Sequence, residues 1–219
     1  METSSNTQGF SLTQLTAINI AKGLTLVIML ALAIAYGVND ARQVIYLCLH
    51  GGYCSWWLLE QYLFPTRTKI LFTEKVDIPT LIVVLLFVGV FYALPAWFAF
   101  TNPTPLGYVS MAIALLLYIF GSLINTAADV QKMTAKSMGA KLVNSEIWRS
   151  VRNVNYLGDL MRYSSFAVVS GSLWSGLLPL TVFALYVQRI LDKEKSMSEK
   201  YDNFDEYQQQ SSRLIPWLW

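Results

Sequence analysis

The stretch LGDLMRYSSFAVVSGSLWSGLLPLTVFALYVQ, residues 157–188, decides how many times the chain crosses a membrane. It is largely apolar, but at about 1.5 Å per residue a single helix of this length would measure about 48 Å, whereas the hydrocarbon core is about 30 Å thick. Gly171, Gly176 and Pro179 interrupt the stretch, and these residue types end or bend helices. We therefore expect a tilted helical hairpin that turns near Gly171 to Gly176, with one long helix as the alternative.

Four further apolar segments precede this hairpin, and each is long enough to cross the hydrocarbon core, which takes about 20 residues. They are Leu15 to Tyr36, Val44 to Phe64, Ile78 to Phe100 and Leu106 to Ile124. The composition agrees, because 54% of the residues are hydrophobic and only 14% are charged, against about 25% charged in soluble domains. The sequence thus predicts an all-α integral membrane protein with about six transmembrane segments, folded as a single domain over residues 1–219.

The basic residues gather in alternate connections and so predict how the chain is oriented. Cytoplasmic loops of membrane proteins carry an excess of lysine and arginine. The residues on one side are Arg67, Lys69, Lys75, Lys132, Lys136, Lys141, Arg149, Arg152, Arg189, Lys193, Lys195, Lys200 and Arg213. Only Arg42 falls on the opposite side. We expect both termini and the C-terminal tail to be cytoplasmic; the membrane itself is not identified.

Several classes of ligand are not expected. The formal net charge of +2 and the absence of a basic stripe with interleaved aromatic residues argue against nucleic acid. Cys48 and Cys54 form neither a CxxC motif nor a disulfide framework, so buried thiols are favoured and no metal site is predicted. Membrane lipid is an expected partner, whereas protein partners and the oligomeric state are not predicted.

Polar residues line up where three chain segments meet the predicted cytoplasmic surface. Spacings of three and four residues place side chains on one face of a helix. The three stripes are Asn125, Asp129, Lys132 and Lys136; Asn155, Asp159 and Arg162; and Arg189 and Lys193. Taken singly, each stripe could be a solvated helix end with snorkelling cations. Short polar side chains cannot snorkel far, however, and ionisable groups at membrane depth usually face a cavity. Together the stripes indicate a net-basic pocket for a phosphate-bearing or otherwise anionic cofactor.

The last part of the chain resembles the membrane superfamily of sterol reductases, steroid 5α-reductases and isoprenylcysteine or phospholipid methyltransferases. Residues 152–161, RNVNYLGDLM, resemble the R-H-x-N-Y-x-G-D-L-M signature of the sterol C=C reductase branch. Residues 129–132 resemble its N-x-Q-K element, and Lys200-Tyr201, Glu206-Tyr207 and residues 213–216 resemble its closing motifs. Asn125 and Asp129 also match an N-x-x-x-D pair of the steroid 5α-reductases. The resemblance covers residues 125–219.

This resemblance implies an NADPH site and a C=C reductase acting on a lipophilic substrate such as a sterol, steroid or isoprenoid. Residues 1–124 would form the lipophilic container and residues 125–219 the cofactor-binding half. Carried over by position, the cofactor-binding residues are Asn125, Asp129, Lys132, Lys136, Arg152, Asn155, Tyr156, Asp159, Arg189 and Tyr201. The chain departs from the pattern at Asn153, where the sterol branch has histidine, and at Asp192-Lys193, which replaces an R-D pair.

Two alternatives to the reductase remain open. An S-adenosylmethionine-dependent methyltransferase of the same superfamily would tend to carry a Glu-Glu pair in the last helix, whereas Lys193-Glu194-Lys195 offers one glutamate. A non-catalytic membrane scaffold or accessory subunit is compatible with the departures at Asn153 and Lys193. Asp159 follows the reductase pattern, so we favour the reductase.

Reduction of a C=C bond requires a proton donor as well as a hydride. The second span carries His50, Tyr53, Trp57 and Glu60 within about one quadrant of a helix. His50 is best interpreted as a hydrogen-bonded core histidine, whereas an intramembrane carboxyl group such as Glu60 is costly to bury in the ionised form. We predict Tyr53, Glu60 and Tyr156 as the catalytic residues.

Overall fold

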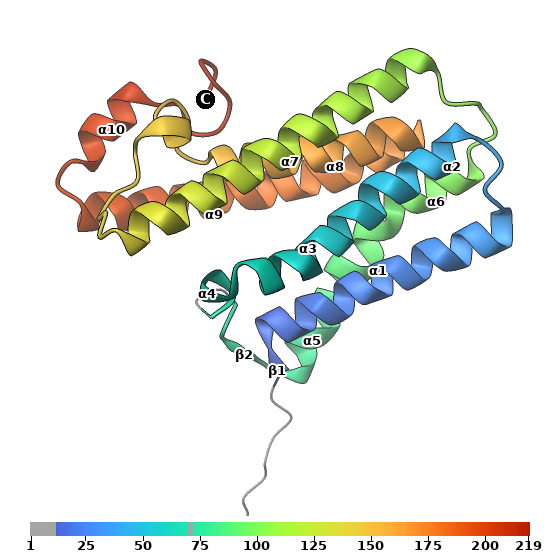
Figure 1. Cartoon of the computed structure of the whole chain (residues 1–219), viewed down its shortest axis with the longest axis horizontal. Helices are drawn as coiled ribbons and strands as arrows, with labels where there is room; N and C mark the ends of the chain where they lie inside the picture. The colour runs from blue at the N-terminus through green and yellow to red at the C-terminus, as the bar shows by residue number, and fades with distance from the viewer. Residues whose placement is uncertain (1–11, 70–71) are drawn as a thin grey trace, which may run out of the picture.

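Six helical segments that run back and forth dominate the computed structural model, which describes residues 12–69 and 72–219 (Figure 1). Four of the segments are built from α1 (Gln14–Tyr36), α7 (Tyr108–Ser137), α8 (Val154–Ser170) and α9 (Leu177–Lys200). The second segment joins α2 (Ala41–Tyr46), a π-helical turn (Leu47–Gly51) and α3 (Gly52–Leu63). The third joins α5 (Ile78–Val84), a π-helical turn (Leu85–Val90), a 3₁₀ turn (Phe91–Ala93) and α6 (Leu94–Thr101). Short elements complete the chain, namely α4 (Pro65–Thr68), α10 (Phe204–Gln210) and the antiparallel strands β1 (Leu12–Thr13) and β2 (Lys75–Val76).

The predicted hairpin is confirmed, and the alternative of one long helix is wrong. Helix α8 ends at Gly171, whose φ of 66° lies in the left-handed region, and a 3₁₀ turn, Leu173–Gly176, leads into α9. A side chain at Gly171 would strike the Arg42 guanidinium, which donates to the carbonyl of Val169 at 2.5 Å. The glycine is therefore required both by the backbone conformation and by the arginine that closes the end of α8.

Within residues 12–69 and 72–219, four helices are long and apolar enough to cross a membrane, which agrees with an all-α membrane protein. They are Gln14–Tyr36, Ile78–Thr101, Tyr108–Ser137 and Leu173–Lys200. The segment Ala41–Leu63 and helix α8 are the other two predicted crossings; whether they span the bilayer stays a prediction. Helix α7 continues well past the predicted boundary at Ile124 to Ser137, which carries the first polar stripe along one continuous helix.

Helices α7 and α8 are the most closely packed pair in the bundle, and two glycines explain why. A Cβ atom placed on Gly158 would lie 2.6 Å from the carbonyl oxygen of Gly121 and 2.8 Å from the backbone nitrogen of Asn125. The contact is reciprocal, because a Cβ on Gly121 would lie 2.6 Å from the carbonyl oxygen of Gly158. Small residues at a helix crossing allow such close approach, and here they bring the first two polar stripes face to face.

The third helical segment deviates from α-helical geometry where it passes α1. The hydroxyl of Thr25 on α1 lies 3.1 Å from the carbonyl of Val88 and 3.0 Å from that of Gly89, within the π-helical turn. The side chain of Leu24 occupies the position that a Cβ on Gly89 would need. Hydroxyl groups commonly satisfy carbonyls that such bulges leave exposed, so this contact fixes α1 against the segment that lines one side of the site.

Candidate functional site

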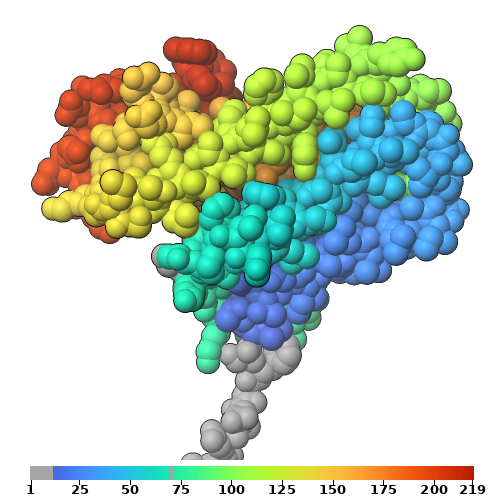
Figure 2. Space-filling model, in the orientation of Figure 1, coloured from blue at the N-terminus to red at the C-terminus, as the bar shows by residue number. Residues whose placement is uncertain are grey.

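A cavity of about 660 Å³ lies between the N-terminal helices and the α7–α8 pair. Helix α7 borders the α3–α4 region on the face shown in Figure 2, and both contribute side chains to the cavity. Nine of the predicted site residues line it, from three helices. These are Tyr53, Glu60, Asn125, Asp129, Lys132, Lys136, Asn155, Tyr156 and Asp159. The first two polar stripes and the second span therefore meet at one place, although nothing in their local sequence requires it.

An amide network holds the α7 and α8 stripes in register. The side-chain nitrogen of Asn125 donates to the backbone carbonyl of Asn155 at 2.9 Å, and the side-chain nitrogen of Asn155 lies 3.4 Å from Oδ1 of Asp129. The side-chain oxygen of Asn155 is buried and has no donor among the described residues. Buried polar atoms are nearly always hydrogen-bonded, so this oxygen is an exception within the network.

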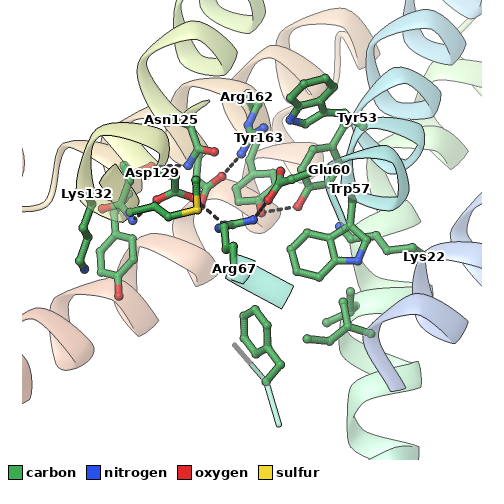
Figure 3. Close-up of a pocket in the computed structure, with 18 of the residues that line it drawn as sticks. Lys22, Tyr53, Trp57, Glu60, Arg67, Asn125, Asp129, Lys132, Arg162 and Tyr163 are labelled. Carbon is green, nitrogen blue, oxygen red and sulfur yellow. Dashed lines mark hydrogen bonds and ion pairs between the residues drawn. The ribbon is translucent and has the colours of Figure 1, made fainter. Parts of the chain in front are cut away.

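Arg67 bridges the two halves of the molecule across the cavity (Figure 3). Its guanidinium forms ion pairs with Glu60 of α3 and with Asp129 of α7; the second, to Oδ2 of Asp129, is 2.6 Å long. All three side chains are partly exposed, between 14% and 23%. The guanidinium is thus shared by two carboxylates from different helices, and Glu60 lines the cavity as a partner of this arginine.

A tyrosine cluster surrounds the second carboxylate of the site. Asp159 forms an ion pair with Arg162 and accepts a hydrogen bond from Tyr186 at 2.9 Å. The Arg162 guanidinium lies 5.0 Å from the centre of the Tyr53 ring, and the hydroxyls of Tyr53 and Tyr163 are 2.8 Å apart. The cluster therefore places a hydrogen-bonded pair of phenols beside a fixed cation.

Tyr156 presents a flat aromatic surface to the same cavity. Its ring stacks on that of Tyr186 with centroids 4.2 Å apart and an interplanar angle of 14°. Lys193 lies 5.8 Å from the Tyr156 ring centre and donates to the side-chain oxygen of Asn153 at 2.8 Å. The two positions at which the chain departs from the sterol-branch motifs thus contact each other directly beside the site.

Three predicted cofactor-binding residues do not line the cavity. Arg189 is exposed on α9, and Tyr201 follows that helix with its ring centre 5.6 Å from the ammonium of Lys136. Arg152 is buried and donates to Oε1 of Glu194 at 2.9 Å; Arg213 of the tail donates to the other carboxylate oxygen of Glu194, also at 2.9 Å. Arg152 therefore fastens the C-terminal tail to the bundle in this structure.

The tail has a second anchor on the loop between α7 and α8. The hydroxyl of Tyr207 donates to the carbonyl of Trp148 at 2.5 Å, and the Trp148 indole donates to the carbonyl of Ala128 at 3.1 Å. Burial raises the pKa of the Tyr207 hydroxyl, so this group stays a neutral donor. The loop and the tail are consequently held against the end of α7 that carries the site lysines.

Two charged residues of the cavity, Lys22 and Arg67, were not predicted as site residues from the sequence. Lys22 of α1 is 2% exposed and faces the cavity; its signal was a single ionisable residue in the middle of an apolar span, which by itself indicates function. Arg67 was counted only as an orientation marker. Its role depends on Asp129, 62 residues later, and no local pattern reveals such a pairing.

His50, in contrast, lies inside the core. It is fully buried, its Nδ1 is 2.8 Å from the Tyr46 hydroxyl, and its ring stacks on Phe166 with centroids 4.4 Å apart. The interpretation as a hydrogen-bonded core histidine agrees with this position. Among residues 12–69 and 72–219, no group of three or more metal-ligating side chains occurs.

Comparisons with known proteins extend the resemblance over most of the chain. The model of a family described as "Protein of unknown function (DUF1295)" matches residues 10–213. The Delta(14)-sterol reductase of Arabidopsis thaliana is 25% identical over 203 residues, which cover 84% of this chain and 54% of that protein. The Delta(14)-sterol reductase TM7SF2 of Mus musculus is 31% identical over 150 residues, which cover 58% of this chain and 35% of that protein. The chain spans about half the length of the first relative and about a third of the second. The predicted resemblance is confirmed, and it reaches well beyond residues 125–219.

Proposed function

The chain belongs to the DUF1295 family, and from that premise we propose that it is a membrane-embedded reductase that uses NADPH to reduce a C=C bond in a lipophilic substrate. The observation that carries the proposal is one cavity of about 660 Å³ that has two unlike walls. The basic wall contains Lys132 and Lys136 of α7; the aromatic wall contains Tyr53, Trp57 and Tyr92. A cavity of this size and mixed lining suits a ligand with one charged and one apolar part.

The donor set of the basic wall fits a nicotinamide dinucleotide phosphate. Lys132 and Lys136 make no ion pair with a carboxylate within the described part of the chain, and ammonium groups bind phosphate well. Asn155 lines the cavity beside these lysines, and the Tyr156 ring offers a stacking surface. When bound, NADPH would supply the hydride; the residues named here would hold it at the α7–α8 face.

Tyr53 is the proton donor in this proposal. Tyr53 lines the cavity, and its hydroxyl lies 2.8 Å from that of Tyr163, which can donate to the phenolate oxygen left behind. The Arg162 cation, 5.0 Å from the Tyr53 ring centre, favours that phenolate electrostatically, and Asp159 fixes Arg162. Glu60 is already ion-paired with Arg67, so we assign it to positioning Arg67 rather than to proton transfer.

The same arrangement supports a proposal for the orientation of the chain in the membrane. Figure 1 shows the connections α1–α2 and α6–α7 at one end of the bundle, whereas the basic connections and the tail lie at the other end, next to α4 and α10. The positive-inside rule assigns that second end to the cytoplasm, where NADPH is available. We therefore propose that both termini are cytoplasmic and that the basic wall opens toward that side.

The test is cofactor binding by the purified protein in nanodiscs of neutral phosphatidylcholine. NADPH should raise the melting temperature, because a ligand that binds only the folded state stabilises it, and the double variant Lys132→Met/Lys136→Met should lose most of this shift. The exposed Lys195 provides the control, since Lys195→Met should keep the shift. Stabilisation by S-adenosylmethionine alone would replace the reductase with the methyltransferase, and no response to either compound would favour the scaffold.

Hydride transfer can be tested without knowing the substrate. Wild-type protein and Tyr53→Phe would be incubated with a membrane lipid extract and NADPH deuterated on the transferred position. Wild-type protein should produce a lipid that gains one deuterium and one proton across a former double bond, and Tyr53→Phe should produce much less of it. A labelled lipid formed equally well by Tyr53→Phe would remove that tyrosine from the mechanism.

A further inference from the structure

Within the part of the chain that the structure describes, the carboxylates that line the cavity are all paired with a cation, whereas its lysines are not paired with a carboxylate. Each of its carboxylates is ion-paired with an arginine: Glu60 and Asp129 with Arg67, and Asp159 with Arg162. The three lysines of the cavity, Lys22, Lys132 and Lys136, have no such partner among residues 12–69 and 72–219. Lys132 and Lys22 are at opposite sides of the view in Figure 3, with Arg67 between them. The cavity thus has a second cationic position, away from the basic wall to which the cofactor is assigned.

Lys22 is surrounded by aromatic rings. Its ammonium lies 3.8 Å from the ring centre of Tyr53, 5.2 Å from that of Tyr92 and 5.9 Å from that of Trp57. Aromatic faces attract a cation, but they accept none of the three N–H bonds that an ammonium can donate. Among the described residues, no oxygen accepts a hydrogen bond from this group. Burying a charged group without a hydrogen-bonded partner destabilises the fold. The presence of a lysine that is unpaired within the described residues at this position therefore indicates a role in binding.

Snorkelling does not explain Lys22. It lies about 12 Å along α1 from the helix start at Gln14, and its side chain turns inward, with 2% of the residue exposed. Ile18 and Val88 also line the cavity. The ammonium therefore faces the cavity and not a membrane surface.

We propose that Lys22 binds a carboxylate carried by the lipophilic substrate, so that the substrate class is a carboxylate-bearing amphiphile. This inference rests on the proposed function in taking the ligand of the aromatic wall to be the substrate. One ammonium matches one monoanionic group, whereas a phosphate monoester would call for the clustered donors that the basic wall has and Lys22 lacks. A neutral hydroxyl or ester can accept a hydrogen bond from Lys22 but leaves the charge uncompensated, and this difference makes the proposal testable.

The experiment measures equilibrium binding of radiolabelled oleate to nanodisc-embedded protein, corrected with empty nanodiscs. Unlabelled oleate and its methyl ester serve as competitors. Losing one member of a buried, hydrogen-bonded charge pair typically costs about 2 kcal/mol or more, which corresponds to about 30-fold in affinity. Wild-type protein should therefore prefer the acid by about 30-fold or more. Lys22→Met should abolish the preference, Lys22→Arg should retain most of it, and Lys195→Met should leave it unchanged.

Several results would overturn the proposal. Equal competition by acid and ester in the wild-type protein, or no displaceable oleate binding at all, excludes a carboxylate site without the use of any variant. Persistence of the preference in Lys22→Met excludes Lys22 as its cause, provided that the melting temperature shows this variant to be folded. NADPH titration of the same samples separates the two proposals. Cofactor binding without acid preference refutes this inference alone, and acid preference without cofactor binding refutes the reductase while leaving the carboxylate site.

Discussion

The glycine contact between α7 and α8 gives the sharpest test of how the site is built. In Gly158→Ala the new Cβ would lie 2.6 Å from the carbonyl oxygen of Gly121 and 2.8 Å from the backbone nitrogen of Asn125. Close C···O contacts in proteins are about 3.3 Å or longer, so the two helices would have to separate by about 0.7 Å at this point. Both struck atoms belong to the backbone, and no side chain can rotate away to relieve the clash.

The expected loss of stability follows from two opposing terms. Replacing a mid-helix glycine by alanine gains about 1 kcal/mol from conformational entropy, whereas overpacking at a rigid contact costs about 3 kcal/mol. The net loss of about 2 kcal/mol should lower the melting temperature by about 4 to 8 °C for a chain of this size. The same separation shifts Asn155 and Asp159 relative to Asn125, so NADPH-induced stabilisation should also decrease.

The assay is thermal unfolding followed by tryptophan fluorescence, with Gly23→Ala as the matched control. Gly23 lies within α1, and a Cβ placed there meets nothing within 4 Å, so the control should melt at the wild-type temperature or slightly above it. A melting temperature for Gly158→Ala equal to or above that of the wild type would refute the close packing of α7 on α8. A low melting temperature in both variants would instead show a general intolerance of alanine.

Three further substitutions test other parts of the structure by the same unfolding assay. Arg67→Met leaves two cavity carboxylates without their shared cation. Because both carboxylates are partly exposed, the free energy of unfolding should fall by about 1 kcal/mol. An unchanged melting temperature would mean that this ion-pair bridge does not contribute to stability. Glu194→Gln removes the negative charge that binds Arg152 and Arg213, and it should lower the free energy of unfolding by about 2 kcal/mol. The C-terminal tail should then be cleaved faster by protease, and cleavage no faster than in the wild type would argue against this anchor. Gly171→Ala should cost about 2 kcal/mol of stability, because the φ of Gly171 is positive and the Arg42 guanidinium fills the space next to it. The control Gly176→Ala should be nearly neutral, because the space around Gly176 is open. Similar melting temperatures for the two variants would contradict the tight turn at Gly171.

The sequence alone was sufficient for features that depend on local chemistry. Hydropathy over about 20 residues identified the helical segments, because a chain in lipid must satisfy its own backbone hydrogen bonds. Gly171, Gly176 and Pro179 located the turn between α8 and α9, because these residue types end or bend helices. The stripes on α7 and α8 were visible for the same reason, since helical periodicity fixes which side chains share a face.

The tertiary structure decided which of these faces meet and what each charged residue does. Arg152 belongs to the most specific motif in the chain, yet it binds Glu194, 42 residues later, away from the cavity. Arg67 was absent from the predicted site, because its partner Asp129 lies 62 residues later in the chain. Lys22 stood out in the sequence as one charge within an apolar span, but only the structure shows that it faces the cavity. Whether two charged side chains pair depends on the distance between them and on their burial. The spacing of residues along one helix predicts neither of these. The sequence therefore determined a helical membrane protein with polar stripes, and only the packing of α1, α3, α7 and α8 turned those stripes into a two-walled cavity.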